Sequence, residues 1–309
     1  MMGRYVIRRL LQMIFVVFGT TFIIYWLVWS LPGDPFAAKC GDRPCPPAVI
    51  DRLREQFNLD DPLLLQYGKY MANILTGDFG VTFQQTSVAD TIARTYPVTL
   101  RLAVLAFAID IIIGLLAGLL SGLRRNGFLD NMILVSTLLA ISIPVFVLGY
   151  VVQLIFGVNL KIISPAVSSE ARWSELIAPA LIIASLSTAY VSRLARSSIA
   201  ENSRADYVRT ATAKGLTRGR VVGVHLLRNS LIPVITYLGL DFGSFLGGAI
   251  VTEGIFNING IGGTLFRALG RHDATMVVPL VILIVLAYLA VNLIVDIAYA
   301  VLDPRIRYE

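Results

Sequence analysis

Residues with charged or reactive side chains are scarce in this sequence. Asp, Glu, Lys and Arg make up only 15% of its 309 residues, and there are 2 histidines and 2 cysteines. The sequence has no HExxH helix, no catalytic triad, no paired carboxylates and no G-x-x-x-x-G-K-[ST] loop to hold the phosphates of ATP. The chain therefore offers no candidate residues for hydrolytic chemistry or ATP cleavage of its own.

Apolar residues are abundant instead. They make up 56% of the chain and give it a mean hydropathy of +0.73, which is more apolar surface than a soluble domain can bury. Several segments have the roughly 20 mostly apolar residues that a transmembrane helix needs. They are 9–30, 98–122, 131–156, 177–196, 234–255 and 277–301. The first lacks the cleavage site of a signal peptide, so the sequence predicts an all-α integral membrane protein with six retained spans.

The basic residues predict how these spans are oriented. Lys and Arg outnumber Asp and Glu in the segments on the side of the N-terminus, whereas acids outnumber bases on the other side. The arginines closest to span ends are Arg4, Arg8, Arg9, Arg124, Arg125, Arg193 and Arg196. Because basic residues near span ends favour the cytoplasm, we expect both termini there. Topology thus explains the net charge of +6. Nucleic-acid binding would need a basic soluble face with stacking aromatics, and the sequence shows none.

A polar segment between two spans, residues 197–233, has the signals of a helical hairpin. Ser203 and Asp206 have the spacing of a capping box, and Gly215 is placed where a helix ends in the left-handed conformation. Thr217 can begin a second helix that runs towards Pro233. One interpretation is an amphipathic hairpin that lies on the membrane surface.

The first helix of this hairpin combines small and basic residues. Ala205, Ala211 and Ala213 would let another surface approach closely. The basic residues around them are Arg204, Arg209 and Lys214. A docking element for another protein is therefore the second interpretation.

Three acids lie within the predicted spans, where charge is costly and usually faces a bundle interior or a wet cavity. Asp110 shares a four-residue repeat with Gly114, Gly118 and Gly122. Small residues at this spacing let helices pack closely, so we expect a structural, hydrogen-bonding role for Asp110. A structural role is also expected for Asp296, close to the cytoplasmic interface.

Asp241 is the candidate for a residue of a transport pathway. Gly239, Gly243 and Gly247 form a packing stripe in its span, and Asp241 lies about 160–200° around the helix from the first two. Contact with lipid is unfavourable for a charge, which leaves a polar pathway or a partner subunit. In a pathway, the carboxylate would attract a cationic group such as an ammonium. In the third span, we expect Pro144 to kink the helix.

Residues 31–97 form a long loop on the outer side. Pro47 begins one predicted amphipathic helix, and residues 61–75 form another. Their apolar faces cover the chain's own spans, contact a partner, or both.

Cys40 and Cys45 are expected on the outer side, where disulfides persist. We predict a disulfide between them, with free thiols or a redox role as alternatives. Without a nearby histidine they make a weak metal site. His225 and His272 fall on opposite sides of the membrane and cannot form one site.

Several motifs resemble those of one transporter family. The hairpin resembles the cytoplasmic "EAA" loop of ABC importer permeases, where a short helix inserts into a cleft of an ATP-hydrolysing subunit. Arg209, Thr210 and Ala211 fall where that family has Glu-Ala-Ala, although the first two differ from it, and Gly215 falls on the family glycine. Four further segments are similar to the B-type permease subunits of dipeptide and oligopeptide importers: "YVIRRLLQMIFVVFGTTFIIYWLVWSLPGDP", "GDFGVTFQQTSVADTIARTYPVTLRLA", "EGIFNINGIGGTLFRAL" and "LDPRIRY".

This resemblance implies a type I ABC-importer permease fold in the cell membrane. Its parts would be a cytoplasmic segment with the first span (1–30), a large extracytoplasmic loop (31–97) and a permease core (98–309) that contains the coupling loop 197–233. The implied partners are a paralogous permease, an extracytoplasmic substrate-binding protein and two ATP-binding subunits or domains, which hold the ATP and Mg. The coupling residues implied are Arg204, Arg209, Thr210, Ala211, Lys214 and Gly215.

Other functions remain open on the sequence alone. Nickel and haem importers share these permeases, so the cargo need not be a peptide. A stand-alone channel or secondary carrier would be equally apolar, but carriers often show internal repeats with broken helices at matching positions, and no convincing repeat is visible. An intramembrane enzyme lacks candidate residues.

Overall fold

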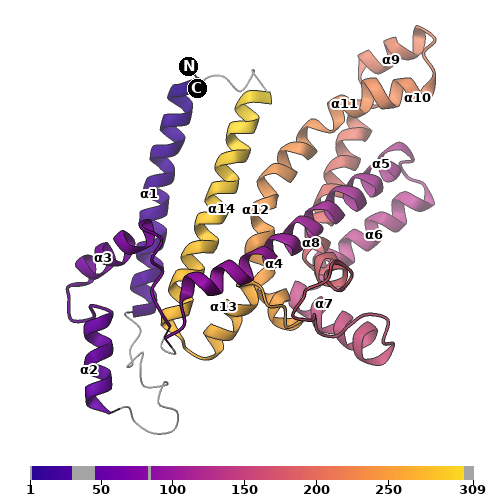
Figure 1. The fold of residues 1–309 in the computed structure, drawn as a ribbon. Coiled ribbons are helices and arrows are strands. Elements are labelled where there is room, and N and C mark those ends of the chain that lie inside the picture. Colours follow the sequence, from indigo (N-terminus) through magenta and orange to yellow (C-terminus); the bar gives the residue numbers. More distant parts are fainter. Residues whose placement is uncertain (1, 30–45, 83–84, 303–309) are drawn as a thin grey trace.

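A computed structural model describes residues 2–29, 46–82 and 85–302 of the chain. Within these ranges every regular element is a helix, apart from one isolated β-bridge between Val81 and Ser87. The long helices lie side by side, and the start of α1, the end of α14 and the α9–α10 region share one end of the molecule (Figure 1). We call this the α9 end. The predicted all-α architecture is confirmed.

Four helical rods are long and apolar enough to cross a bilayer, and two bent helix pairs bring the total to six within the described residues. The rods are α1 (Met2–Trp29), α4 (Val88–Ile109) continued by η2 (Asp110–Gly114) and α5 (Leu115–Leu123), α8 (Trp173–Asn202) and α14 (Ala274–Leu302). In the first bent pair, α6 (Phe128–Ser142) is followed by α7 (Val145–Val152) and its continuation η3 (Gln153–Asn159). In the second, a rod of α10 (Arg218–Arg220), η4 (Val221–Leu226) and α11 (Leu227–Ser230) is followed by α12 (Ile232–Ile255). In the most apolar window, 50% of α8 is buried but only 11% of α1. Helix α8 is therefore central, and α1 exposes its apolar surface.

The third predicted span is broken rather than kinked. Proline has no amide proton and disfavours helix at the residue before it, so α6 ends at Ser142 and α7 begins at Val145 after Pro144. The two halves differ in direction by 102°. Gln153 holds the turned half in place, because its Nε2 donates to the carbonyl oxygens of Pro165 (2.7 Å) and Ile255 (2.8 Å). The expected single span 131–156 is therefore two helices.

The glycines of the second span let α8 approach closely. A Cβ atom on Gly114 would lie 2.7 Å from Cγ1 of Val191, and one on Gly118 would lie 2.5 Å from Cβ of Ala195. Gly122 meets Ile199 in the same way, at 2.9 Å. These glycines thus form a close contact between helices at the four-residue spacing that favours it.

The glycines of the fifth span do not form one continuous stripe within the chain. A Cβ atom on Gly243 would lie 2.8 Å from Tyr288 of α14, so this glycine is closely packed. Gly247 is exposed, with no described atom within 4 Å of its Cβ position, and Gly239 is half-buried. Within the described chain, α14 covers Gly243 and leaves Gly247 uncovered, so close packing at Gly247 stays a prediction.

A buried polar cluster joins α12 to α4 and to α13 (Ile261–Gly270). Glu253 is fully buried, and its two carboxylate oxygens accept hydrogen bonds from Oγ1 of Thr99 (2.7 Å) and the amide of Gly263 (2.7 Å). Thr99 Oγ1 in turn accepts the amide of Ile261 at 2.8 Å. A Cβ atom on Gly260 would overlap the Glu253 carboxylate. We call Glu253, Thr99 and residues 260–263 the clasp.

The two helices predicted in the outer loop are confirmed as α2 (Pro47–Gln56) and α3 (Leu63–Leu75). Met71 and Ile74 of α3 are buried against Tyr25 of α1 and against Val278 and Ile282 of α14. Helix α3 therefore covers the ends of its own chain's spans opposite the α9 end.

The Cys40–Cys45 disulfide stays a prediction, because both residues lie outside the described ranges. Gly41, Asp42 and Pro44 favour a turn between the two cysteines. Mass spectrometry of the non-reduced protein should find the two joined within one chain. Alkylation of both thiols without prior reduction would contradict the prediction.

At the α9 end, the first and last helices are joined by an ion pair. Arg9 Nη2 of α1 lies 3.3 Å from Asp296 Oδ1 of α14. Asp296 thus has a partner in the chain itself, and its position near the end of the last span agrees with the expectation of a structural role.

Candidate functional site

The segment between α8 and α12 forms a helical hairpin that projects from the α9 end (Figure 1). Its first arm is α9 (Asp206–Ala213), and its second begins with α10 and η4. The start of α9 differs from the prediction, because Ala205 occupies the N-cap position and no side chain caps the helix. Ser203 ends α8 instead, and its Oγ donates to the carbonyl oxygen of Ala200 at 2.8 Å. The predicted capping box is therefore wrong.

Gly215 turns the chain between the two arms in the left-handed conformation that the sequence predicts. Its φ is +78°, and its amide donates to the carbonyl oxygen of Thr212 at 2.9 Å. The space around its Cβ position is open among the described residues. The backbone conformation, not lack of space, therefore requires glycine here. Thr217 follows at the N-cap of α10, without a side-chain cap.

Exposure divides α9 into two faces. Asp206, Arg209, Thr210 and Ala213 are all exposed, and their spacing places them on one face of the helix. We call these four residues the outer face of α9. Ala211 is only 5% exposed, because α9 packs against η4 of the second arm. The interpretation that Ala211 itself admits a docking surface is therefore wrong.

The basic residues of the hairpin are accessible to a partner. Arg209 Nη1 lies 3.8 Å from Asp206 Oδ1, but these side chains are 75% and 97% exposed, and such a surface pair contributes little. Arg204 and Lys214 are exposed as well. A protein with acidic residues around a groove could therefore pair with all three basic side chains.

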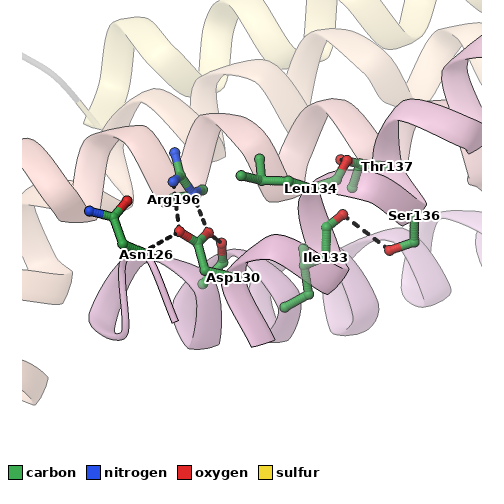
Figure 2. Close-up of polar contacts among 8 residues, drawn as sticks. Asn126, Asp130, Ile133, Leu134, Ser136, Thr137 and Arg196 are labelled. Carbon is green, nitrogen blue, oxygen red and sulfur yellow. Dashed lines mark hydrogen bonds and ion pairs between the residues drawn. The ribbon is translucent and has the colours of Figure 1, made fainter. Parts of the chain in front are cut away.

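A buried ion pair fixes α8 close to the hairpin (Figure 2). Arg196 of α8 donates from Nε to Asp130 Oδ1 at 2.6 Å and from Nη2 to Asp130 Oδ2 at 2.7 Å. The Asp130 side chain is 0% exposed and also accepts hydrogen bonds from Ser121 and from the amide of Asn126. These contacts tie the turn between α5 and α6 to α8, about two helical turns before α8 ends at Asn202. Asp130 was not singled out from the sequence.

We expect Asp130→Ala to lower the melting temperature of the detergent-solubilised protein. Removal of one partner from a buried ion pair costs about 3–5 kcal/mol, because the other charge is left unpaired. Arg193→Ala is the matched control, since Arg193 is an exposed residue of the same helix. Equal melting temperatures for the two variants would show that the pair does not stabilise the fold.

Two acids of different spans meet at one serine of α8. Ser187 Oγ lies 2.7 Å from Asp110 Oδ2 of η2 and 2.5 Å from Asp241 Oδ2 of α12. Asp110 is fully buried and hydrogen-bonded, as expected for a structural residue, whereas Asp241 is half-buried. Asp241 Oδ1 also accepts a hydrogen bond from Ser244 Oγ at 2.9 Å. The pathway candidate therefore has partners within the chain that the sequence did not reveal.

Comparisons with known proteins cover the whole of this architecture. Residues 111–308 match the family described as binding-protein-dependent transport system inner membrane component, and residues 2–103 match the N-terminal part of such membrane components. The chain is 36% identical over 309 residues to the glutathione transport system permease protein GsiC of Escherichia coli (strain K12), with 100% of both chains covered. It is 33% identical over 331 residues to the dipeptide transport system permease protein DppB of Alkalihalophilus pseudofirmus, with 98% of this chain and 99% of that protein covered.

Proposed function

Because this chain belongs to the binding-protein-dependent transport system inner membrane component family, we propose that it is the transmembrane permease subunit of an ATP-driven peptide importer. The observation that carries the proposal is similarity over the full length to permeases named for glutathione and for dipeptides. Both of these cargoes are short peptides, which favours peptide over nickel or haem.

In this function the chain forms part of the translocation pathway, and ATP is hydrolysed elsewhere. The sequence contains no phosphate-binding loop, so the ATP and Mg belong to two separate ATP-binding subunits or domains. A paralogous permease completes the pathway, and a substrate-binding protein delivers the cargo from outside. The basic residues near span ends favour a cytoplasmic location for the α9 end.

The α9 hairpin is the element through which this chain docks on its ATPase. It projects beyond the spans (Figure 1), and the outer face of α9 is exposed along its whole length. Arg204, Arg209 and Lys214 pair with acids at the rim of a groove on the ATPase. Motion passes between the subunits because the hairpin is continuous with α8, which Arg196 and Asp130 hold against the rest of the permease.

The proposal is tested by purification of the intact complex through a tag on this chain. We expect a second, similar permease and a protein with a Walker A motif to co-purify. Their recovery should be lost in a Gly215→Val variant that still reaches the membrane. If the chain purifies without an ATPase and takes up peptide on an ion gradient alone, it is a secondary carrier and the proposal is wrong.

A further inference from the structure

The crossing of η2, α8 and α12 places the hydroxyl of Ser187 between two carboxyl groups. Ser187 Oγ lies within hydrogen-bond distance of both Asp110 Oδ2 and Asp241 Oδ2. A hydroxyl donates one hydrogen bond, whereas an ionised carboxylate can only accept. If both acids were ionised, one of the two contacts would join two acceptors without a proton between them. The geometry therefore calls for one further proton at this site.

Burial indicates which acid holds that proton. Asp110 is 0% exposed, and its Oδ1 is buried beside the hydroxyl of Thr188. Asp241 is half-buried, and Ser244 Oγ lies 2.9 Å from its Oδ1 and 2.6 Å from its backbone carbonyl oxygen. A buried charge costs much more than a buried neutral acid. The proton therefore belongs on Asp110 and the negative charge on Asp241.

Among the described residues, the groups around the pair supply no cation to balance a second charge. Besides each other, the two acids interact with the titratable side chain of Tyr237 of α12, which is not cationic. From α14, the side chains that pack on this part of α12 at Gly243 are Tyr288 and Asn292, and neither is cationic. Arg193 of α8 and Arg101 of α4 are six and nine residues away from Ser187 and Asp110, about 9 and 14 Å along the helix axes.

The backbone at Asp110 is also unusual. Residues Asp110–Gly114 are π-helical within an otherwise α-helical rod, and such short segments occur frequently at functional sites. The wider turn begins at Asp110, directly beside Ser187. The π-helical segment thus distinguishes this crossing from the rest of the second span.

We propose that Asp110, Ser187 and Asp241 form a site that holds a single negative charge for the ammonium group of the cargo. Asp110 stays protonated and donates a hydrogen bond to Ser187 Oγ. Ser187 in turn donates a hydrogen bond to Asp241. Asp241 stays ionised at the less buried end of this chain of hydrogen bonds and attracts the free amino group of a peptide. The cargo assignment rests on the proposed function, whereas the order of the hydrogen bonds does not.

Infrared spectroscopy of the purified complex tests the order of the hydrogen bonds. The spectrum of the wild type minus that of Asp110→Asn should contain the carbonyl stretch of a protonated carboxylic acid, and the band should shift in D₂O. The spectrum of the wild type minus that of Asp241→Asn should contain carboxylate bands instead. Absence of the acid band from the first difference, or its presence only in the second, would overturn the proposal.

Peptide uptake tests whether the cargo binds to this negative charge. The amide of Asp110→Asn can still donate to Ser187, so this variant should retain roughly tenfold more peptide uptake than Asp110→Leu, which leaves Ser187 without that donor. Asp241→Asn should lose uptake, and Asp241→Glu should restore part of it. Equal uptake by the two Asp110 variants, or normal uptake by Asp241→Asn, contradicts the proposal.

Failure of the proposed charge-holding site can be distinguished from failure of the proposed function. If the wild-type complex takes up no peptide, the function is wrong, and the infrared result still decides where the proton is. If the wild type takes up peptide but the acid band is missing, the function stands and the charge-holding site is wrong. A Ser187→Thr variant, which keeps the hydroxyl, should retain more uptake than Ser187→Ala.

Discussion

Replacement of Ala213 by tryptophan is expected to abolish ATP-driven uptake while the permease remains folded in the membrane. Ala213 lies on the outer face of α9 and is exposed, so the indole would project from the surface that is proposed to enter the ATPase. A side chain of this size within the proposed interface should weaken docking on the order of tenfold or more. Uptake and recovery of the ATPase with a tagged permease should fall together.

Ala213→Ser is the control for this experiment, because it keeps a small side chain at the same position. It should retain uptake, and both variants should be present in the membrane at the wild-type level. Normal recovery of the ATPase with Ala213→Trp would show that α9 is a solvated hairpin and not a docking element.

Two other substitutions in the hairpin act by different routes. Gly215→Val introduces a β-branched residue at φ +78°, a region that such residues strongly disfavour, so it should redirect the second arm. Ala211→Trp would place the indole inside the hairpin, where overpacking typically costs about 1–3 kcal/mol. Loss of docking in the latter variant would therefore report on the hairpin's own fold, and Ala213 is the more direct probe of the interface.

Glu253→Ala is expected to have a large effect on stability. The substitution leaves the Thr99 hydroxyl and the Gly263 amide without their buried acceptor, at a cost of about 1–3 kcal/mol for each unsatisfied group. Gly260→Ala should be similarly destabilising, because its Cβ atom would overlap the Glu253 carboxylate. Both variants should unfold at lower temperature in detergent and yield less protein.

Gly270→Ala is the matched control for the clasp. Gly270 is the last residue of α13, is exposed and has open space at its Cβ position, so its substitution should leave the melting temperature close to that of the wild type. If Glu253→Ala and Gly260→Ala also melted with the wild type, the clasp would not hold α13 against α12 and α4.

The elements that the sequence predicts well depend on local chemistry. Runs of apolar residues predict the spans because a bilayer fixes their minimum length. Pro47 marks the first residue of α2, since its missing amide is tolerated there. Gly215 predicts the left-handed turn because the preference belongs to the residue itself.

The features that the sequence did not reveal depend on contacts between distant segments. Pro144 predicts a disturbed helix, but the bend of 102° also depends on the contacts that Gln153 makes far along the chain. The burial of Ala211 follows from packing of the second arm on α9, which the composition of α9 does not specify.

The meeting of Asp110 and Asp241 is the clearest example of this limit. Ser187 is 77 residues from Asp110 and 54 from Asp241, and no periodicity within one helix predicts the register between helices. The polar residues of the fourth span were the available signal, because hydroxyl groups in an apolar helix need partners. That signal indicates that partners exist without identifying them.

ATP-driven peptide uptake by the reconstituted complex tests the central claim most directly. Proteoliposomes that contain the complex purified through this chain should accumulate labelled dipeptide or glutathione only when the substrate-binding protein is present on the outside and ATP on the side of the α9 hairpin. Accumulation should stop with Ala213→Trp and continue with Ala213→Ser. Accumulation without ATP on an ion gradient, or none of either peptide under any of these conditions, would contradict the assignment of this chain as a peptide-importer permease.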